Sequence, residues 1–145
     1  MSGLITMGLL PGQSIEIAGI DASKRWNRTG LVIECGVTYR FDVVQVSGWR
    51  DGNVETDPDG YEKMHLLPLL PARRYPLGRW LKLIGAIGTS AWDYFPIGKG
   101  CTRKASAAGE LYCFANDASF RYHDNDGQLT LKVSREDGDA DQRSK

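Results

Sequence analysis

Short runs in which apolar and polar residues alternate recur along this chain and limit it to a fold built from β-strands. Val37, Tyr39 and Phe41 alternate with polar residues, which is the two-residue period of a strand with one buried face. Similar strand-like runs occupy residues 13–18, 31–34, 37–46, 79–88, 92–97, 104–106, 109–116 and 128–134. The 17 glycines supply turns between them. The pattern predicts an all-β, jelly-roll-like β-sandwich of about eight strands.

The segments between the expected strands predict one turn, one irregular segment and a C-terminal tail. Cys35-Gly36 predicts a tight turn that joins residues 31–34 and 37–46 in a hairpin. Residues 64–76 contain three prolines and predict an irregular segment packed on the sheet. With 145 residues the chain is expected to form a single domain, a sandwich over residues 1–134 followed by a flexible polar tail over residues 135–145.

Charge and hydropathy exclude several classes of partner. The 18 basic residues are balanced by 18 acidic residues, so no overall positive field attracts nucleic acid. The N-terminus has no basic residue before its apolar ones, which argues against a cleavable signal peptide. Prolines and charges interrupt residues 64–88, the most apolar stretch, so no membrane insertion is expected. We therefore expect a soluble protein whose compartment the sequence leaves open, with its three cysteines as free thiols.

The richest polar cluster lies between two expected strands. Five side chains with amide or carboxylate oxygens stand within it: Asn116, Asp117, Asp124, Asn125 and Asp126. Calcium prefers such hard oxygen ligands and takes six to eight of them, so the cluster is a candidate calcium site. The alternative is an ordinary hairpin loop, because Asp126-Gly127 is a common turn pair. A second acidic stretch, residues 57–60, lacks the later ligands of an EF-hand.

Catalytic motifs are scarce. Only His65 and His123 could serve as imidazole bases, and neither stands in a metalloprotease or nucleophile motif. Asp117 and Asp124 could act as an acid and base on a sugar, which keeps glycoside hydrolysis open as an alternative. Trp49 ends an expected strand, where its ring could wall a binding site or pack in the core. We expect a protein that is not an enzyme.

The C-terminal part carries a family resemblance. Residues 109–117 (Gly-Glu-Leu-Tyr-Cys-Phe-Ala-Asn-Asp), followed by Tyr122-His-Asp-Asn-Asp-Gly127 and a final alternating strand, resemble the PA-IL-like family of galactose-binding lectins. Residues 26–33, 39–41, 46–49 and 83–88 look like the earlier strands of that family in the same order. The similarity spans about residues 13–134.

The resemblance implies a jelly-roll sandwich with one Ca²⁺ that binds two vicinal hydroxyls of a galactose-type sugar. It implies side-chain metal ligands at Asp117, Asp124 and Asn125, and backbone carbonyl ligands at Arg121 and near Gly52. The residues expected at the sugar are Asp117, Asp124, Arg121, Ala118, His123 and Trp49. Asp124 stands where the family has an asparagine, and Arg121 stands where it has a small hydroxyl residue.

The polar cluster and the resemblance together predict a calcium-dependent carbohydrate-binding domain for galactose-type sugars. The alternative is a sandwich interaction module that has lost sugar binding, because the Arg121 and Phe120 side chains could close the pocket. The resemblance also suggests homo-oligomers, which would provide multivalent avidity.

Overall fold

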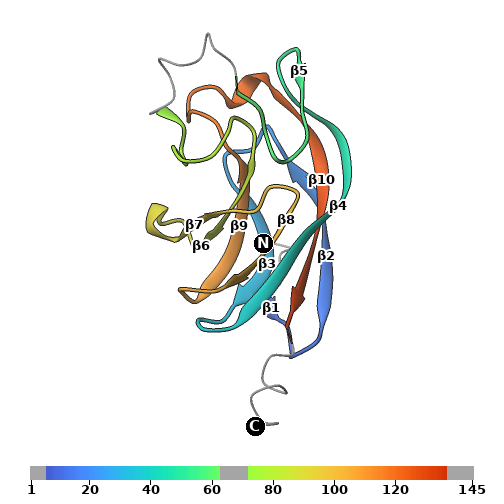
Figure 1. Cartoon of the computed structure of the whole chain (residues 1–145), viewed down its shortest axis with the longest axis vertical. Coiled ribbons are helices and arrows are strands. Elements are labelled where there is room, and N and C mark those ends of the chain that lie inside the picture. Colours follow the sequence, from blue (N-terminus) through green and yellow to red (C-terminus); the bar gives the residue numbers. More distant parts are fainter. Residues whose placement is uncertain (1–5, 63–71, 137–145) are drawn as a thin grey trace, which may run out of the picture.

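The computed structural model describes residues 6–62 and 72–136, which form two facing β-sheets (Figure 1). One sheet, here the β3–β9 sheet, contains, in spatial order, β1 (Met7–Gly8), β3 (Asn27–Ile33), β9 (Gly109–Ala115), β6 (Leu83–Ile87) and β7 (Tyr94–Pro96). The other, the β4–β10 sheet, contains β2 (Ser14–Asp21), β10 (Asn125–Arg135), β4 (Thr38–Asp51) and β5 (Val54–Glu55), with β8 (Gly100–Lys104) also paired to β4. Two short 3-10 helices are η2 (Ala91–Asp93) and η3 (Tyr122–Asp124). The expected all-β sandwich is confirmed.

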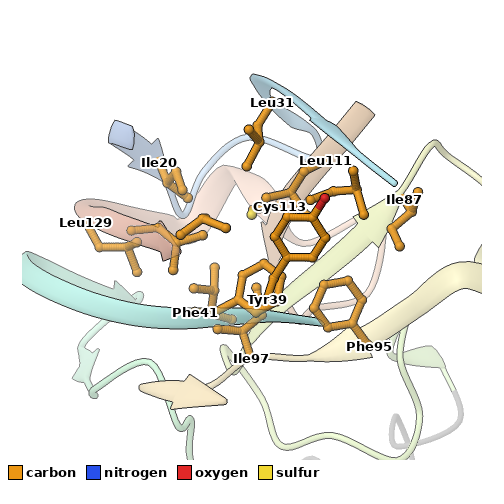
Figure 2. Close-up of a cluster of buried hydrophobic side chains, with 14 of the residues drawn as sticks. Ile20, Leu31, Tyr39, Phe41, Ile87, Phe95, Ile97, Leu111, Cys113 and Leu129 are labelled. Carbon is orange, nitrogen blue, oxygen red and sulfur yellow. The ribbon is translucent and has the colours of Figure 1, made fainter. Parts of the chain in front are cut away.

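The core lies between the two sheets (Figure 2). It forms because alternate residues of each strand point to the same face, so the inner faces of both sheets carry the apolar positions. Phe41 of β4 and Phe95 of β7 join the sheets through ring centroids 5.3 Å apart. Leu131 and Leu111 are fully buried on the facing strands β10 and β9. This continuous apolar layer holds the two sheets together.

The predicted hairpin of residues 31–34 and 37–46 is wrong, although the turn at Cys35-Gly36 is present. β3 and β4 lie in different sheets, so the chain crosses from one layer to the other at this turn. Backbone hydrogen bonds fix the crossing: Gly36 donates to the carbonyl of Ala105 at 2.9 Å, and Ala105 donates to the carbonyl of Val37 at 2.8 Å. Alternation reports which face of a strand is buried and carries no information on the partner strand.

The Asp126-Gly127 pair is not a hairpin turn. Both residues lie inside β10, where the register against β4 shifts between Asp126 and Gln128. Gly127 has a φ of 103°, and a Cβ there would overlap the backbone of Gly48. Gly48 itself has a φ of 66°. The glycine is therefore needed for a bulge at which two strands approach closely.

Several expectations about the ends and connections fall partly outside the described residues. β10 extends to Arg135, while the rest of the expected tail, residues 137–145, is not described. Most of the expected irregular segment, residues 63–71, and with it His65, is likewise not described. All three cysteines are free, and burial raises the pKa of Cys113 to about 12. Within the described ranges, no helix is long and apolar enough to cross a membrane.

Candidate functional site

Segments distant in sequence meet at the end of the sandwich where β4 turns into β5 and η3 leads into β10 (Figure 1). The backbone N–H of Gly52, in the β4–β5 turn, donates to the carbonyl of Asp124 at 2.8 Å. Asn125 faces Asp51 in the β10–β4 ladder. The segment before β6 joins the same end, because Leu81 donates to the carbonyl of Asn116 at 2.7 Å. The structure thus brings Gly52 beside the Asn/Asp cluster, as the resemblance implies.

Asn116 has a structural role that uses all of its polar atoms. Its Oδ1 accepts a hydrogen bond from the Tyr75 N–H at 2.9 Å, and its Nδ2 donates to the Tyr75 carbonyl at 2.9 Å. The same Nδ2 lies 3.1 Å from the carbonyl oxygens of Gly78 and Arg79. The side chain is fully buried. Asn116 therefore anchors the turn at residues 75–79, and its side-chain oxygen is already hydrogen-bonded within the protein.

Asp117 is a fully buried carboxylate with one unpaired oxygen. Its Oδ1 accepts a hydrogen bond from the Ala118 N–H at 2.7 Å, whereas its Oδ2 is buried without a hydrogen-bond partner. Burial raises the pKa of Asp117 to about 6, and the nearby Asp51 adds to the rise. The Ala118 N–H, Arg121 and Asn125 oppose it by favouring the charged form.

Asp51 is the second buried acid of the site and was not expected from the sequence. Its Oδ2 accepts a hydrogen bond of 2.5 Å from the hydroxyl of Tyr61, and its Oδ1 lies 3.7 Å from Nη2 of Arg121. Burial raises the pKa of Tyr61, as does its hydrogen bond to Asp51. The only sequence signal for Asp51 was its position beside Gly52 at the end of an expected strand.

Asn125 supplies a second unpaired oxygen. Its Nδ2 donates to the carbonyl of Ala22 at 3.2 Å, while its Oδ1 is buried without a hydrogen-bond partner. The side chain lies close enough to Asp117 to lower the pKa of that carboxyl. A buried oxygen without a donor is costly, so Oδ2 of Asp117 and Oδ1 of Asn125 are candidate cation ligands.

Asp124 and His123 lie at the surface of the same end. Oδ1 of Asp124 is 3.1 Å from Nε2 of His123, and the two side chains are 45% and 75% exposed. The backbone carbonyl of Asp124 is used by Gly52. In this arrangement the Asp124 carboxylate pairs with His123. The described residues contain no group of three or more His, Cys, Asp or Glu side chains placed to hold a metal ion.

Two residues expected at the sugar lie in the interior instead. Trp49 is fully buried, and its Nε1 donates to the carbonyl of Leu81 at 2.9 Å. Ala118 is also fully buried. Neither residue presents surface to a ligand in this structure, because the segments after β5 and before β6 cover this end of the sheet. Trp49 is therefore a core residue, the alternative that its apolar ring also allowed.

Arg121 places its side chain among the buried acids. The guanidinium lies 5.6 Å from the Trp80 ring centroid as well as 3.7 Å from Asp51, and its side chain is only 20% exposed. Nη1 is buried without a hydrogen-bond partner. The backbone carbonyl of Arg121, the expected metal ligand, accepts the N–H of Asp124 at 3.3 Å. The cluster of Asp51, Tyr61, Asp117, Arg121 and Asn125 is called the acidic end cluster below.

The two sheets and the acidic end cluster define an all-β sandwich with a polar site at one end. The same fold occurs in the N-terminal domain of EclA, described as a PllA-like lectin, with a TM-score of 0.59 and 24% sequence identity. The match covers 85% of this chain and 95% of that one. No family model and no curated protein sequence matches the chain. The likeness therefore shows the fold.

Proposed function

We propose that this chain is a calcium-dependent carbohydrate-binding domain that holds galactose-type sugars at the acidic end cluster. One observation carries the proposal: Oδ2 of Asp117 and Oδ1 of Asn125 are both buried without hydrogen-bond partners, on two side chains close enough to interact. The match to a lectin domain over most of the chain supports the same assignment. A cation coordinated by both oxygens would offset the cost of burying them without hydrogen-bond donors.

The residues present fit a calcium ion in their chemistry. Asp117 and Asn125 would supply side-chain oxygens, and Arg121 and the turn at Gly52 would supply backbone carbonyls. Asp124 would complete the set after turning its half-exposed carboxylate away from His123. A calcium ion bound here would exchange coordinated water for two vicinal hydroxyls of a sugar. His123 and Asp124, at the surface, are the side chains of this end placed to contact the rest of the sugar.

The proposed activity is binding without a covalent step, so the domain would not be an enzyme. A single sugar site gives weak affinity, and several copies together would give avidity. A homo-oligomer is therefore part of the proposal.

A second candidate is a sandwich interaction module without sugar binding. It is favoured by one observation, the Arg121 guanidinium placed near Asp51 and over Trp80, where it provides a positive charge without a metal ion. In this alternative the end cluster is purely structural.

Melting temperature separates the two candidates. Protein stripped with a chelator is heated alone, with millimolar calcium, and with calcium plus galactose or mannose. A ligand that binds the native state raises the melting temperature by mass action. We expect a rise with calcium and a further rise with galactose that mannose does not give. Absence of any calcium effect would reject the calcium site and leave the interaction module.

Two variants assign the effect to the cluster. Asp117→Asn keeps the shape of the side chain and removes its charge, so the calcium-induced rise should disappear. Glu16→Gln removes a charge from an exposed residue of β2, outside the cluster, and should leave the rise unchanged. A calcium response that survives in Asp117→Asn would place the ion elsewhere.

A further inference from the structure

The Arg121 side chain lies on the acidic end cluster in a way that an ordinary surface arginine does not. Four-fifths of it is buried, and its Nη1 has no hydrogen-bond partner. An arginine buries its charge only where negative charge compensates it. Here that charge comes from Asp51, whose Oδ1 is 3.7 Å from Nη2, and from Asp117, whose pKa Arg121 lowers.

The contact is close enough for attraction and too long for a hydrogen bond. At 3.7 Å the Nη2–Oδ1 pair lies beyond the usual donor–acceptor range, and Asp51 already receives the hydroxyl of Tyr61. The unpaired Oδ2 of Asp117 and the unpaired Nη1 of Arg121 are both buried in the same cluster, yet they do not bond to each other. The guanidinium thus neutralises the cluster without satisfying its oxygens.

A guanidinium held by charge attraction without hydrogen bonds to the acids can be displaced from the cluster. Arg121 begins the loop turn that becomes η3, and a fifth of its side chain reaches solvent, which gives the guanidinium a path outward. A divalent cation would offer the two acids more charge and direct coordination. The side chain and such a cation would both need the space beside Asp51 and Asp117, and their positive charges would repel.

We infer that the Arg121 guanidinium is an internal cation that competes with calcium for the acidic end cluster, so that calcium binds only when this side chain moves out. The inference rests on the proposed function and adds a residue that sets its calcium affinity. The cluster has two states, one neutralised by Arg121 and one by calcium. The apparent calcium affinity equals the intrinsic affinity multiplied by the fraction of molecules in which Arg121 has left the cluster.

The test measures calcium binding by isothermal titration calorimetry in chelator-stripped wild type, Arg121→Ser and Arg121→Gln. Both variants remove the charge, and Arg121→Gln keeps much of the side-chain length if the serine variant does not fold. We expect both to bind calcium about tenfold or more tightly than the wild type. Arg28→Ser is the matched control, because Arg28 pairs with Glu110 on the other sheet at 2.8 Å. Its calcium affinity should equal that of the wild type.

Melting without calcium gives an independent readout. Removing Arg121 leaves Asp51 and Asp117 buried without a compensating charge, so the calcium-free variants should melt below the wild type. Added calcium should then raise their melting temperature by more than it raises that of the wild type. A purely structural arginine would lower stability in the same way but would not increase calcium affinity.

The outcomes separate this inference from the proposed function. If the wild type binds calcium and the variants bind it equally or more weakly, competition by Arg121 is rejected and the calcium site stands. If only the variants bind calcium, competition stands and the wild-type protein is not calcium-dependent. If no protein binds calcium, both are rejected.

Discussion

The hydroxyl of Tyr61 donates a 2.5 Å hydrogen bond to Oδ2 of Asp51, which ties the segment after β5 to the last residue of β4. Asp51 is 5% exposed, so water cannot replace this donor freely. The bond therefore holds a buried carboxylate in place at the end of the sandwich where the function is proposed.

Replacing Tyr61 by phenylalanine should destabilise the protein by about 1–3 kcal/mol, because a buried charged acceptor loses its donor. Urea denaturation of calcium-free protein measures the change. Tyr94→Phe is the control, since the Tyr94 ring packs against Trp26 at a centroid distance of 6.0 Å and its ring is retained. Equal losses in the two variants would show that the bond to Asp51 adds nothing.

Asp117 should make the metal-free protein less stable as pH rises. The pKa of the Asp117 carboxyl rises from the ordinary value of 3.8 to about 6 in the folded protein. The folded state therefore holds the carboxyl proton more strongly than the unfolded chain does. The stabilisation is present at low pH and is lost as pH rises from about 4 to about 6. Burial is the main cause of the raised pKa of Asp117, and Asp51 adds to it, while the Ala118 N–H, Arg121 and Asn125 oppose it.

Asp117→Asn isolates that contribution, because the amide cannot ionise and its oxygen can still accept from Ala118. At neutral pH in chelator the variant should exceed the wild type in stability by about 1–3 kcal/mol, and the difference should vanish near pH 4. Denaturation at a series of pH values tests this. A difference that stays constant with pH would mean that Asp117 titrates normally.

Asn116→Asp should destabilise the turn at residues 75–79. The new carboxylate would keep the acceptor for Tyr75 but would face the carbonyls of Gly78 and Arg79 without a donor. A loss of about 2–4 kcal/mol is expected, with faster tryptic cleavage in this segment. Asn53→Asp makes the same change in an exposed turn and should be close to neutral. Resistance to trypsin equal to that of the wild type would contradict the anchoring role.

Gly127→Ala should be among the most damaging small substitutions in the chain. The residue has a left-handed φ of 103°, and its new Cβ would meet the backbone of Gly48. A loss of about 3 kcal/mol or more is expected. Gly36→Ala is the comparison, because Gly36 has a φ of 86° but no atom within 4 Å of a Cβ there; it should cost about 1 kcal/mol. The ratio of the two losses, measured by thermal denaturation, separates overlap from backbone strain.

The strands were predictable where alternation is long, and their partners were not. The expected strands 13–18, 109–116 and 128–134 fall in β2, β9 and β10, except that residues 13 and 116 lie one position outside β2 and β9. The expected hairpin at Cys35-Gly36 failed because a tight turn between two alternating runs can equally join two sheets. Pairing depends on contacts between strands far apart in the chain, which local patterns do not encode.

Apart from Gly52, which the resemblance implied, the candidate site was predictable only in its C-terminal half. Asp117, Asn125 and Arg121 were expected from one continuous segment, and the structure brings them together. Asp51 and Tyr61 were missed because only the fold brings the end of β4 and the segment after β5 onto that segment. Trp49 was expected either to wall the site or to pack in the core, and the structure shows the second, with its Nε1 bonded to the Leu81 carbonyl.

β10 comes last among the strands and is paired on both edges, with β2 and with β4. During synthesis of the chain, β2 and β4 leave the ribosome long before β10 can join them, and β3 likewise waits for β9. Until then the nascent chain carries strand edges whose N–H and C=O groups lack their native partners, which favours pairing between chains. The sandwich therefore closes only after β10 has been synthesised, and chaperones that shield nascent strands should increase its yield.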